Sequence, residues 1–563
     1  MTPTEMEKLL TEAAQLFQAG KFDESEAACI RLLENIPEQP QALQLLGFIY
    51  FGKQQPDTAI DYLVRSTQAA PDNIEAHFNL ARAYEELGDI EQAVSSYRTA
   101  HACLPEDLEA LSALGRALAK QGHFEDAEGY FSQAVAQSPE TAACHVNLAN
   151  VLSSQRRHQD AEDSYRNAIN IDSQLAPAFN GLGQAQLGQG QIDDALASIH
   201  QAIALNPDFA DAHVTRGNAL KAKGQILDAI QSYQMALKIA PDNTDAHFNL
   251  SLALFISGKF TEGWPEYEWR WQWQFMASPK RPLPQPAWQN ENLVNTSVIV
   301  WGEQGIGDEI MFASLLPDLI EEASSVTVEC EPRLLPIYKR SFPDIDLIAK
   351  EATPNSKLLN HSAHFQLAIG SLGQHYRPSI DAFPKHDGYL KADADQIKNI
   401  SNQYRTRFPG KRLIGISWKS GNEELGAMRS ATLDMWQPVF QHADCAFINV
   451  QYGDVHAELE NFSRQTGVEI HEDQAVDPLT DMDAFAAQLA ALDLIISIDN
   501  STVHLTGALG LPTWTLLPTI PDWRWMLESS TSHWYPAMRL FRQQTTGEWD
   551  DVFNQISKAL ESN

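Results

Sequence analysis

Small and bulky residues recur with a fixed period of 34 positions through the first half of the chain. One register of this period holds alanine, at Ala59, Ala93, Ala127, Ala161, Ala195 and Ala229. Another holds a bulky residue, at Tyr97, Phe131, Tyr165, Ile199, Tyr233 and Tyr267. Alanine lets two helices approach closely, and a bulky side chain fills the space between neighbouring helix pairs. The pattern therefore predicts a stack of helix pairs.

Turn residues keep the same period. Proline recurs at Pro37, Pro71, Pro105, Pro139, Pro207 and Pro241, and glycine at Gly20, Gly88, Gly122, Gly190, Gly224 and Gly258. Glycine lets a helix end in a left-handed turn, and proline stops the second helix of each pair. These registers resemble the tetratricopeptide repeat over residues 1–275, with about eight units. The resemblance implies an α-solenoid with a groove that binds a peptide or protein.

Two polar registers are candidates for that groove and its surroundings. Asn79, Asn147 and Asn249 share one register, and amide side chains can hold a peptide backbone without reading its side chains. Ordinary polar surface on a solvated helix is the alternative. The other register holds histidine, at His77, His145, His213 and His247. We expect these histidines to pack between helices rather than to bind a ligand.

The periodic region ends in a segment rich in tryptophan and then in proline. Trp264, Trp269, Trp271 and Trp273 fall within ten residues, which predicts a rigid junction that covers the apolar face of the last repeat. Residues 276–296 contain four prolines, which favours an extended linker between domains.

From Ser297 onwards, short β-rich runs such as "SVIVW", "RLIGISW" and "DLIISI" alternate with helical stretches. This alternation predicts parallel sheet with helices on both faces. The length of the region from Ser297 to Asn563 fits two Rossmann-like halves, residues 297–392 and 411–563, better than one large sheet. The predicted fold class is therefore α + α/β, a helical solenoid followed by two Rossmann-like halves.

Composition and charge narrow the function classes. The chain has 563 residues and a formal net charge of −34, which disfavours nucleic acid and anionic membranes as partners, although the charge also serves solubility. No apolar run is long enough for a membrane span, and the first residues do not form a secretory signal. Five widely spaced cysteines without a C-x-x-C pair argue against a disulfide framework and a zinc site. We expect a cytoplasmic protein.

Candidate chemistry lies after two of the predicted strands. "VWGEQGIGDEI" places Gly302, Gly305, Gly307 and Asp308 in a loop that leads into a helix. Ligands in open α/β sheets bind at such carboxyl ends of strands, although an acid at a helix start is also an ordinary cap. "SIDNSTVHLTGALG" forms a second strand–loop–helix segment whose helix start can bind an anion, with His504 one turn further on. A capped helix with a packed histidine is the alternative.

These two segments resemble the heptosyltransferase-like (family 9) glycosyltransferases of the GT-B fold. The resemblance is to the subgroup that carries this domain behind tetratricopeptide repeats and includes flagellin glycosyltransferases. "EGWPEYEWRW", "PDWRWML" and "WYPAMRLFRQ" fit the same subgroup. The resemblance spans nearly the whole chain and implies a glycosyltransferase whose acceptor side is the first half and whose nucleotide-sugar side is the second.

The resemblance also implies roles for individual residues. Asp308 would be the general base, and the donor's phosphates would lie at Asp499, Asn500, Ser501, Thr502 and His504. Lys419 and Arg429 are candidates for assisting the diphosphate. No metal and no cofactor are expected, since cationic side chains and N–H groups suffice and the two core segments lack a D-x-D triplet. Trp523, Arg524 and Trp525 are candidates for stacking on the donor's base or walling the cleft, with packing in the core as the alternative for the two tryptophans.

The function that follows is a cytoplasmic protein O-glycosyltransferase. An inverting, metal-independent enzyme would transfer a sugar from a CMP-, UDP- or ADP-linked donor to serine or threonine of a protein held by the repeats, with flagellin as the leading acceptor. One alternative is sugar transfer to a glycolipid or polysaccharide precursor. Another is a catalytically inactive scaffold or chaperone.

Overall fold

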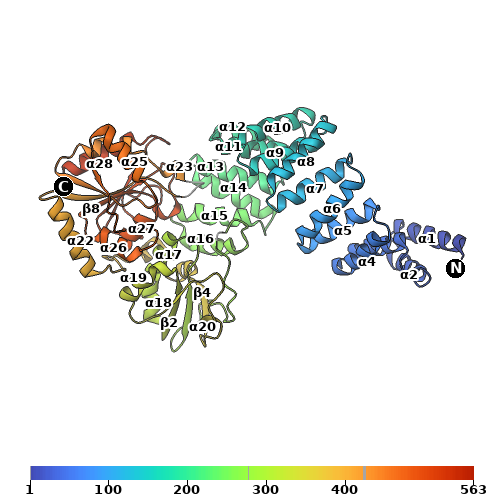
Figure 1. Cartoon of the computed structure of the whole chain (residues 1–563), viewed down its shortest axis with the longest axis horizontal. Coiled ribbons are helices and arrows are strands. Elements are labelled where there is room, and N and C mark those ends of the chain that lie inside the picture. Colours follow the sequence, from blue (N-terminus) through green and yellow to red (C-terminus); the bar gives the residue numbers. More distant parts are fainter. Residues whose placement is uncertain (1, 277, 422–425, 563) are drawn as a thin grey trace. The chain divides into compact units, whose positions relative to one another are not determined.

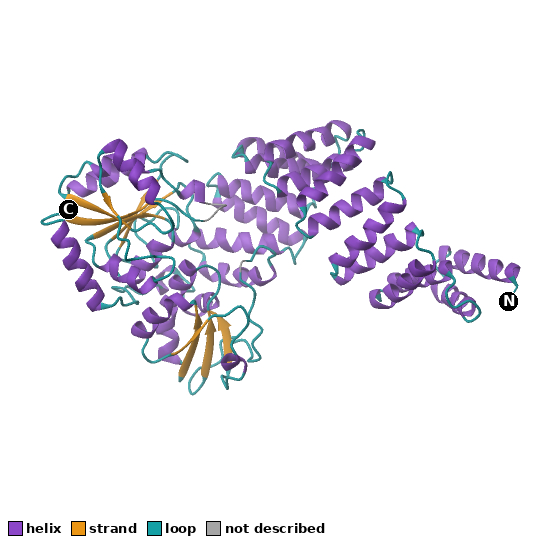
Figure 2. Cartoon of the chain, viewed as in Figure 1, coloured by secondary structure: helices purple, strands orange, loops and turns teal. Residues whose placement is uncertain are grey.

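The computed structural model describes residues 2–276, 278–421 and 426–562. The chain divides into two compact units, Met1–Ala219 and Leu220–Asn563. The first is helical, and the second combines helices with two sheets (Figures 1 and 2). The second compact unit therefore contains the last repeat helices as well as the sheets. The sequence pattern instead predicts that the repeat domain ends near residue 275 and that the linker ends at residue 296.

Helices of the repeat region form eight successive pairs within the described residues. Their bounds are α1 Pro3–Gln18, α2 Phe22–Leu33, α3 Pro40–Gly52, α4 Pro56–Ala69, α5 Ile74–Leu87, α6 Ile90–Cys103, α7 Leu108–Lys120, α8 Phe124–Gln137, α9 Ala142–Ser154, α10 His158–Ile171, α11 Ala176–Gly188, α12 Ile192–Leu205, α13 Ala210–Ala222, α14 Ile226–Ile239, α15 Thr244–Ile256 and α16 Phe260–Tyr267. Residues of the alanine register are fully buried, and those of the bulky register are at most 2% exposed. The two registers therefore build the core as predicted.

A left-handed residue ends the first helix of every pair. The six periodic glycines have φ between 72° and 82°. Where the register lacks glycine, Gln54 and Arg156 adopt the same conformation, with φ of 58° and 61°. The turn is thus a property of the repeat, and two positions bear the strain that glycine avoids.

The four aligned histidines share one structural contact. Each Nε2 lies 2.8–3.0 Å from the carbonyl oxygen of the proline six residues earlier, in the pairs His77–Pro71, His145–Pro139, His213–Pro207 and His247–Pro241. The ring therefore closes the turn that precedes its helix and satisfies a carbonyl that would otherwise lack a helical partner.

The second unit contains two sheets whose named strands all pair in parallel within the described residues. The first has the order β3-β2-β1-β4, and the second β10-β9-β8-β5-β6-β7. The strands are β1 Ser297–Trp301, β2 Ser325–Cys330, β3 Asp346–Ala349, β4 Phe365–Ala368, β5 Arg412–Ser417, β6 Cys445–Asn449, β7 Ile470–His471, β8 Leu494–Ile498, β9 Thr513–Leu517 and β10 Met538–Arg542. Parallel sheets with reversing strand order agree with the predicted α/β class.

Helices connect these strands. The α-helices are α17 Ile306–Phe312, α18 Leu316–Glu322, α19 Leu335–Ser341, α20 Ser356–Leu359, α21 Gly373–Tyr376, α22 Ala394–Arg407, α23 Gly426–Arg429, α24 Gln437–Phe440, α25 His456–Thr466, α26 Met482–Ala490, α27 Ser501–Ala508 and α28 Asp550–Glu561. The 3-10 helices are η1 Glu268–Gln272, η2 Ala313–Leu315, η3 Pro332–Leu334, η4 Ile369–Leu372, η5 Ile380–Ala382, η6 Leu433–Trp436 and η7 Trp523–Trp525. Within the described residues, none of these helices, nor those of the repeats, combines the length and apolarity that crossing a bilayer requires.

Trp264 of α16 fixes the last repeat to the first sheet's half. Its indole N–H donates to the carbonyl of Arg377 at 2.8 Å, and a Cβ on Gly373 would come within 2.1 Å of its ring. Arg281, in the proline-rich segment, is buried and forms an ion pair with Glu329. The segment is irregular, as a linker should be, but its side chains anchor it to the sheet.

Candidate functional site

The two candidate segments meet in space. Helix α17 follows β1 and helix α27 follows β8, so both begin at carboxyl ends of parallel strands. A Cβ built on Gly307 would lie 2.9 Å from Cδ2 of His504, a distance that real Cβ atoms do not show. Glycine at position 307 therefore lets the start of α17 touch the imidazole of α27.

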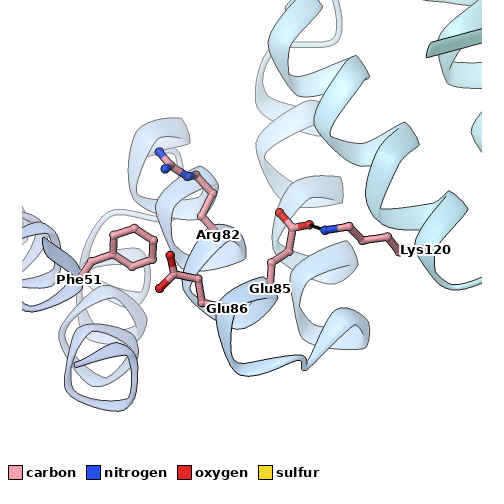
Figure 3. Close-up of a pocket in the computed structure, with 5 residues that line it drawn as sticks. All are labelled: Phe51, Arg82, Glu85, Glu86 and Lys120. Atoms are coloured by element: carbon pink, nitrogen blue, oxygen red, sulfur yellow. Dashed lines mark hydrogen bonds and ion pairs between the residues drawn. The ribbon is translucent and has the colours of Figure 1, made fainter. Parts of the chain in front are cut away.

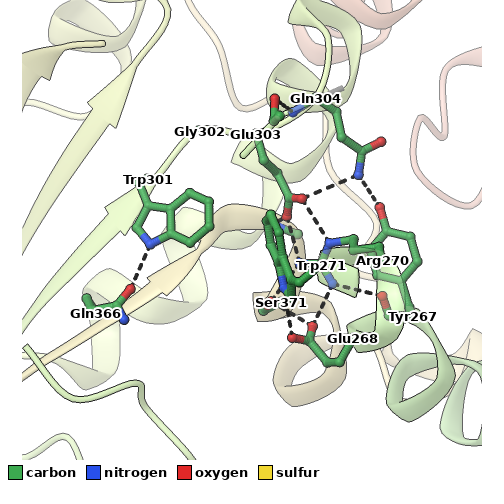
Figure 4. A network of polar contacts seen from close by, with 12 residues as sticks. Tyr267, Glu268, Arg270, Trp271, Trp301, Gly302, Glu303, Gln304, Gln366 and Ser371 are labelled. Carbon is green, nitrogen blue, oxygen red and sulfur yellow. Dashed lines mark hydrogen bonds and ion pairs between the residues drawn. The ribbon is translucent and has the colours of Figure 1, made fainter. Parts of the chain in front are cut away.

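A buried network shapes the glycine loop (Figure 4). The Arg270 guanidinium donates two hydrogen bonds of 2.9 Å to the Glu303 carboxylate, and both side chains are fully buried. Arg270 also donates to Glu268 and to the hydroxyl of Ser371, both at 2.8 Å. The carboxylate of Glu303 in turn accepts the backbone N–H of Gly370 at 3.0 Å. The repeat's last turn, η1, thus holds the loop that follows β1.

Position 302 also leaves no room for a Cβ unless Glu309 shifts. A Cβ there would lie 2.2 Å from the Glu309 carboxylate, which is buried beneath the loop. Burial raises the pKa of Glu309 to about 7, although the N–H of Glu331 donates to its carboxylate at 2.8 Å. Glu309 therefore carries a proton over much of the acidic range.

Asp308 makes two contacts at the start of α17. Its Oδ2 accepts the backbone N–H of Gly305 at 3.1 Å, which is the cap that the sequence allows as an alternative. Its Oδ1 forms an ion pair with the guanidinium of Arg524, a residue of η7 after β9. The side chain of Asp308 remains 21% exposed. Asp308 therefore caps α17 and also contacts the second half of the α/β region.

Arg524 continues into a chain of alternating charges, which we call the ion-pair cluster: Asp308, Arg524, Asp522, Arg429 and Asp499. Arg524 pairs with Asp522, and Arg429 lies 3.4 Å from Asp522 and 3.1 Å from Asp499. Burial opposes ionisation of Asp522, but Arg524 and Arg429 more than offset it and lower the pKa of Asp522 to about 2. Burial raises the pKa of Asp499, and the negative charge of Asp522 adds to that shift while Arg429 opposes it.

His504 borders the ion-pair cluster as a neutral ring. Its Nδ1 lies 2.9 Å from the Tyr535 hydroxyl, and its ring stacks on Trp525 with centroids 5.5 Å apart. Burial, followed by the positive charge of Arg524, lowers the pKa of His504 to about 3. A phosphate at this place would therefore meet an imidazole that offers a hydrogen bond and no charge.

Some of the remaining residues of the predicted anion loop have structural contacts. Asn500 caps α27, since its Oδ1 accepts the N–H of Thr502 at 3.0 Å, and its Nδ2 donates to the Ser417 hydroxyl at 2.7 Å. Thr502 is fully buried, and Ser501 is partly exposed at the first helical position. Asn500 therefore ties the end of β5 to the turn after β8.

The two predicted diphosphate residues lie in different places. Arg429 belongs to the ion-pair cluster. The ammonium of Lys419 instead pairs with Glu458 on α25, and the Lys419 side chain is 47% exposed. In this structure the positive charge beside Asp499 comes from Arg429, while Lys419 contributes its backbone carbonyl as an acceptor for Asn500.

Sequence reasoning missed the part played by Arg524, Asp522 and Lys221. The "PDWRWML" motif was the available signal, but its tryptophans pack in the core while Arg524 turns toward Asp308. Trp523 packs on Phe255 with centroids 4.7 Å apart. Lys221 donates to Asn249 at 3.1 Å, and burial lowers its pKa to about 8 although Asp522 opposes the shift. Asn249, a predicted groove residue, is thus engaged by a lysine whose charge Asp522 stabilises.

The other predicted groove residues belong to the first unit. Asn79 donates to the carbonyl of Glu75 at 2.7 Å, and both Asn79 and Asn147 are partly exposed. A pocket of about 280 Å³ lies nearby along α3, α5 and α7, lined by Phe51, Arg82, Glu85, Glu86 and Lys120 (Figure 3). Its charges include the 2.8 Å pair of Glu85 with Lys120.

Comparison with known families confirms the repeats. One family model described as tetratricopeptide repeat matches residues 112–177, 180–244 and 214–267, and a second of the same description matches residues 50–117. The predicted N-terminal solenoid of tetratricopeptide repeats is therefore correct. Such domains generally mediate binding between proteins.

Individual relatives match part of the chain. Protein FlbA of Caulobacter vibrioides is 30% identical over 322 residues, which cover 54% of this chain and 53% of that protein. The chain thus spans about half the length of this relative. A tetratricopeptide repeat protein from Parabacteroides merdae is 19% identical with a TM-score of 0.39, covering 45% of this chain and 99% of its own. PilW, a type IV pilus biogenesis factor, is 20% identical with a TM-score of 0.34, covering 38% and 98%.

Proposed function

We propose that this protein is an inverting, metal-independent glycosyltransferase of the GT-B type, which transfers a sugar from a nucleotide-activated donor to a protein hydroxyl in the cytoplasm. One observation carries the proposal. Asp308 after β1 and the Asp499–His504 loop after β8 come from different sheets, yet they converge on one ion-pair cluster. Two facing halves with a base on one and anion-binding groups on the other suit sugar transfer from a phosphate leaving group.

The chemistry assigns a task to each group. The acceptor oxygen forms its bond to the anomeric carbon as the bond from that carbon to the donor's phosphate breaks, and Asp308 takes the hydroxyl proton. Arg429, Arg524 and the start of α27 stabilise the departing phosphate, with His504 donating a hydrogen bond as a neutral ring. Attack opposite the leaving group inverts the anomeric centre.

The repeats favour a protein as the acceptor. A tetratricopeptide groove supplies binding energy remote from the reacting hydroxyl, which a small acceptor would not use. Flagellin is the leading candidate because the chain resembles repeat-bearing enzymes that modify it. Transfer to a glycolipid or polysaccharide precursor is the less favoured enzyme function, since a chain with net charge −34 repels anionic lipid.

One observation favours a second candidate, an inactive scaffold. Both oxygens of Asp308 already have partners, Gly305 and Arg524, as expected of a purely structural carboxylate. Activity therefore decides between the two functions.

The test uses the purified full chain with flagellin and CMP-, UDP- or ADP-linked sugars, and follows released nucleotide and the intact mass of the acceptor. We expect Asp308→Ala and His504→Ala to reduce transfer at least about 100-fold. Transfer at the wild-type rate by both variants would show that the site is elsewhere. If the wild-type chain transfers no sugar, the scaffold function is favoured.

A further inference from the structure

The ion-pair cluster holds no surplus positive charge for a phosphate. Its two guanidinium groups face three carboxylates, and each of the five residues has its ion-pair partner within the cluster. A diphosphate that binds here must therefore compete for a cation that is already paired.

Arg524 is the cation whose removal would change the site most. Arg429 joins two carboxylates of the second half, Asp499 and Asp522, whereas Arg524 joins Asp522 to Asp308 of the first half. Arg524 is 12% exposed and lies over the Trp523 ring, 4.9 Å from its centroid. Its Nε is buried without a hydrogen-bond partner among the described residues. The guanidinium thus retains one donor that no group of the described residues uses.

Arg524 obstructs Asp308 as a base while this pairing lasts. Each carboxylate oxygen has two lone pairs, but Oδ2 already accepts the N–H of Gly305 and Oδ1 faces Arg524, so an acceptor hydroxyl must compete with the guanidinium for Oδ1. Release of Arg524 would free Oδ1 and leave the Gly305 contact, and with it the position of the side chain, intact.

We propose that Arg524 is an anion-operated switch: a phosphate or diphosphate group draws Arg524 away from Asp308 and thereby frees the carboxylate only when the donor is bound. The role of Asp308 as base rests on the proposed function, but the exchange of partners is a binding event that needs no sugar transfer. The switch also gives Arg524 two successive partners, the carboxylate first and the phosphate afterwards.

The proposal predicts an effect that a purely structural ion pair would not produce. Asp308→Asn keeps the size of the side chain and an oxygen for the Gly305 N–H, but removes the charge that competes with the ligand. We expect this variant to bind inorganic pyrophosphate about tenfold more tightly than the wild-type chain. Arg524→Ala should weaken pyrophosphate binding about tenfold or more. The affinity of Arg524→Lys should lie between that of the wild-type chain and that of Arg524→Ala.

The test is isothermal titration calorimetry of the full-length chain with inorganic pyrophosphate. A double variant shows whether the tighter binding of Asp308→Asn and the weaker binding of Arg524→Ala arise from the same ion pair. Asp308→Asn/Arg524→Ala should bind like Arg524→Ala alone, because the released cation is then absent. Arg407→Ala serves as the control, since it removes an arginine that pairs with Glu469 on the exposed surface at 3.0 Å. Should Arg524→Ala fail to fold, the pyrophosphate affinity of Asp308→Asn relative to the wild-type chain still tests the switch.

Wild-type or weaker affinity in Asp308→Asn would overturn the switch. A parallel transfer assay separates this failure from that of the proposed function. Tighter pyrophosphate binding without any sugar transfer supports the switch and contradicts the transferase, whereas transfer with unchanged pyrophosphate binding contradicts the switch alone.

Discussion

Gly307 and His504, 197 positions apart in the chain, lie so close that a methyl group on the glycine would come within 2.9 Å of the imidazole. The glycine is the second residue of the helix after β1, and the histidine lies in the helix after β8. Two strand–loop–helix segments that the sequence marks separately therefore meet, beside the ion-pair cluster.

Gly307→Ala should push the start of α17 away from α27. Because the contact is with a buried ring held by Tyr535 and Trp525, we expect about 1–3 kcal/mol of destabilisation and a reduced rate of sugar transfer. Gly129→Ala is the matched control, since that glycine lies within α8 with nothing within 4 Å of an added Cβ. It should leave transfer unchanged and gain up to about 1 kcal/mol in urea unfolding. Equal effects of the two substitutions would contradict the close approach.

Gln54→Gly should stabilise the first unit. Gln54 occupies the left-handed position with φ of 58°, which costs a residue with a side chain about 1 kcal/mol that glycine does not lose. The reciprocal change is Gly122→Ala, at φ of 82° with open space around it, and it should destabilise by a similar amount. Urea unfolding followed by circular dichroism measures both, and a loss of stability in Gln54→Gly would refute the strain.

Removing either partner of the Arg270–Glu303 pair should be costly. Both groups are fully buried, so Arg270→Met leaves the Glu303 carboxylate without its cation and should destabilise by about 3–5 kcal/mol. Glu303→Gln should cost less, because Arg270 still pairs with Glu268. The double variant Arg270→Met/Glu303→Gln should lose clearly less than the sum of the two, because no charge of the pair remains. Additive losses in thermal unfolding would mean that the two side chains act independently.

Glu309 should make the stability of the second unit depend on pH. Its pKa is about 7 in the folded chain against an ordinary value of 4.5, so the folded state holds more protons between these values and loses stability as pH rises through that range. Glu309→Gln lacks the ionisable group and should gain up to about 3 kcal/mol relative to the wild-type chain above pH of about 7. Below pH of about 4.5 the two should unfold alike. A difference in stability that stays constant across this pH range would exclude Glu309 as its source.

The sequence predicted those features that a local pattern determines. The 34-residue period located the left-handed turns, because glycine at Gly88 or Gly122 reports a backbone conformation directly. The run "SVIVW" predicted β1, since a buried parallel strand needs apolar residues on both faces.

Features set by packing between distant segments were not predictable in the same way. The pairing of Asp308 with Arg524 depends on how two halves of the second unit meet, and no spacing encodes it. Lys419 stays a predicted phosphate ligand, and its pairing with Glu458 of α25 is a second contact that its position after β5 does not encode. Compactness also places α14 to α16 with the sheets, because Trp264 and Arg270 bind that region more firmly than the repeat period reveals.

The most direct test of the account is the intact mass of flagellin from cells that encode the wild-type protein, lack it, or carry Asp308→Asn. We expect a mass increment of one or more sugar residues in the first cells and its loss in the other two. Flagellin of the same mass in all three would contradict the claim that Asp308 serves sugar transfer to this acceptor.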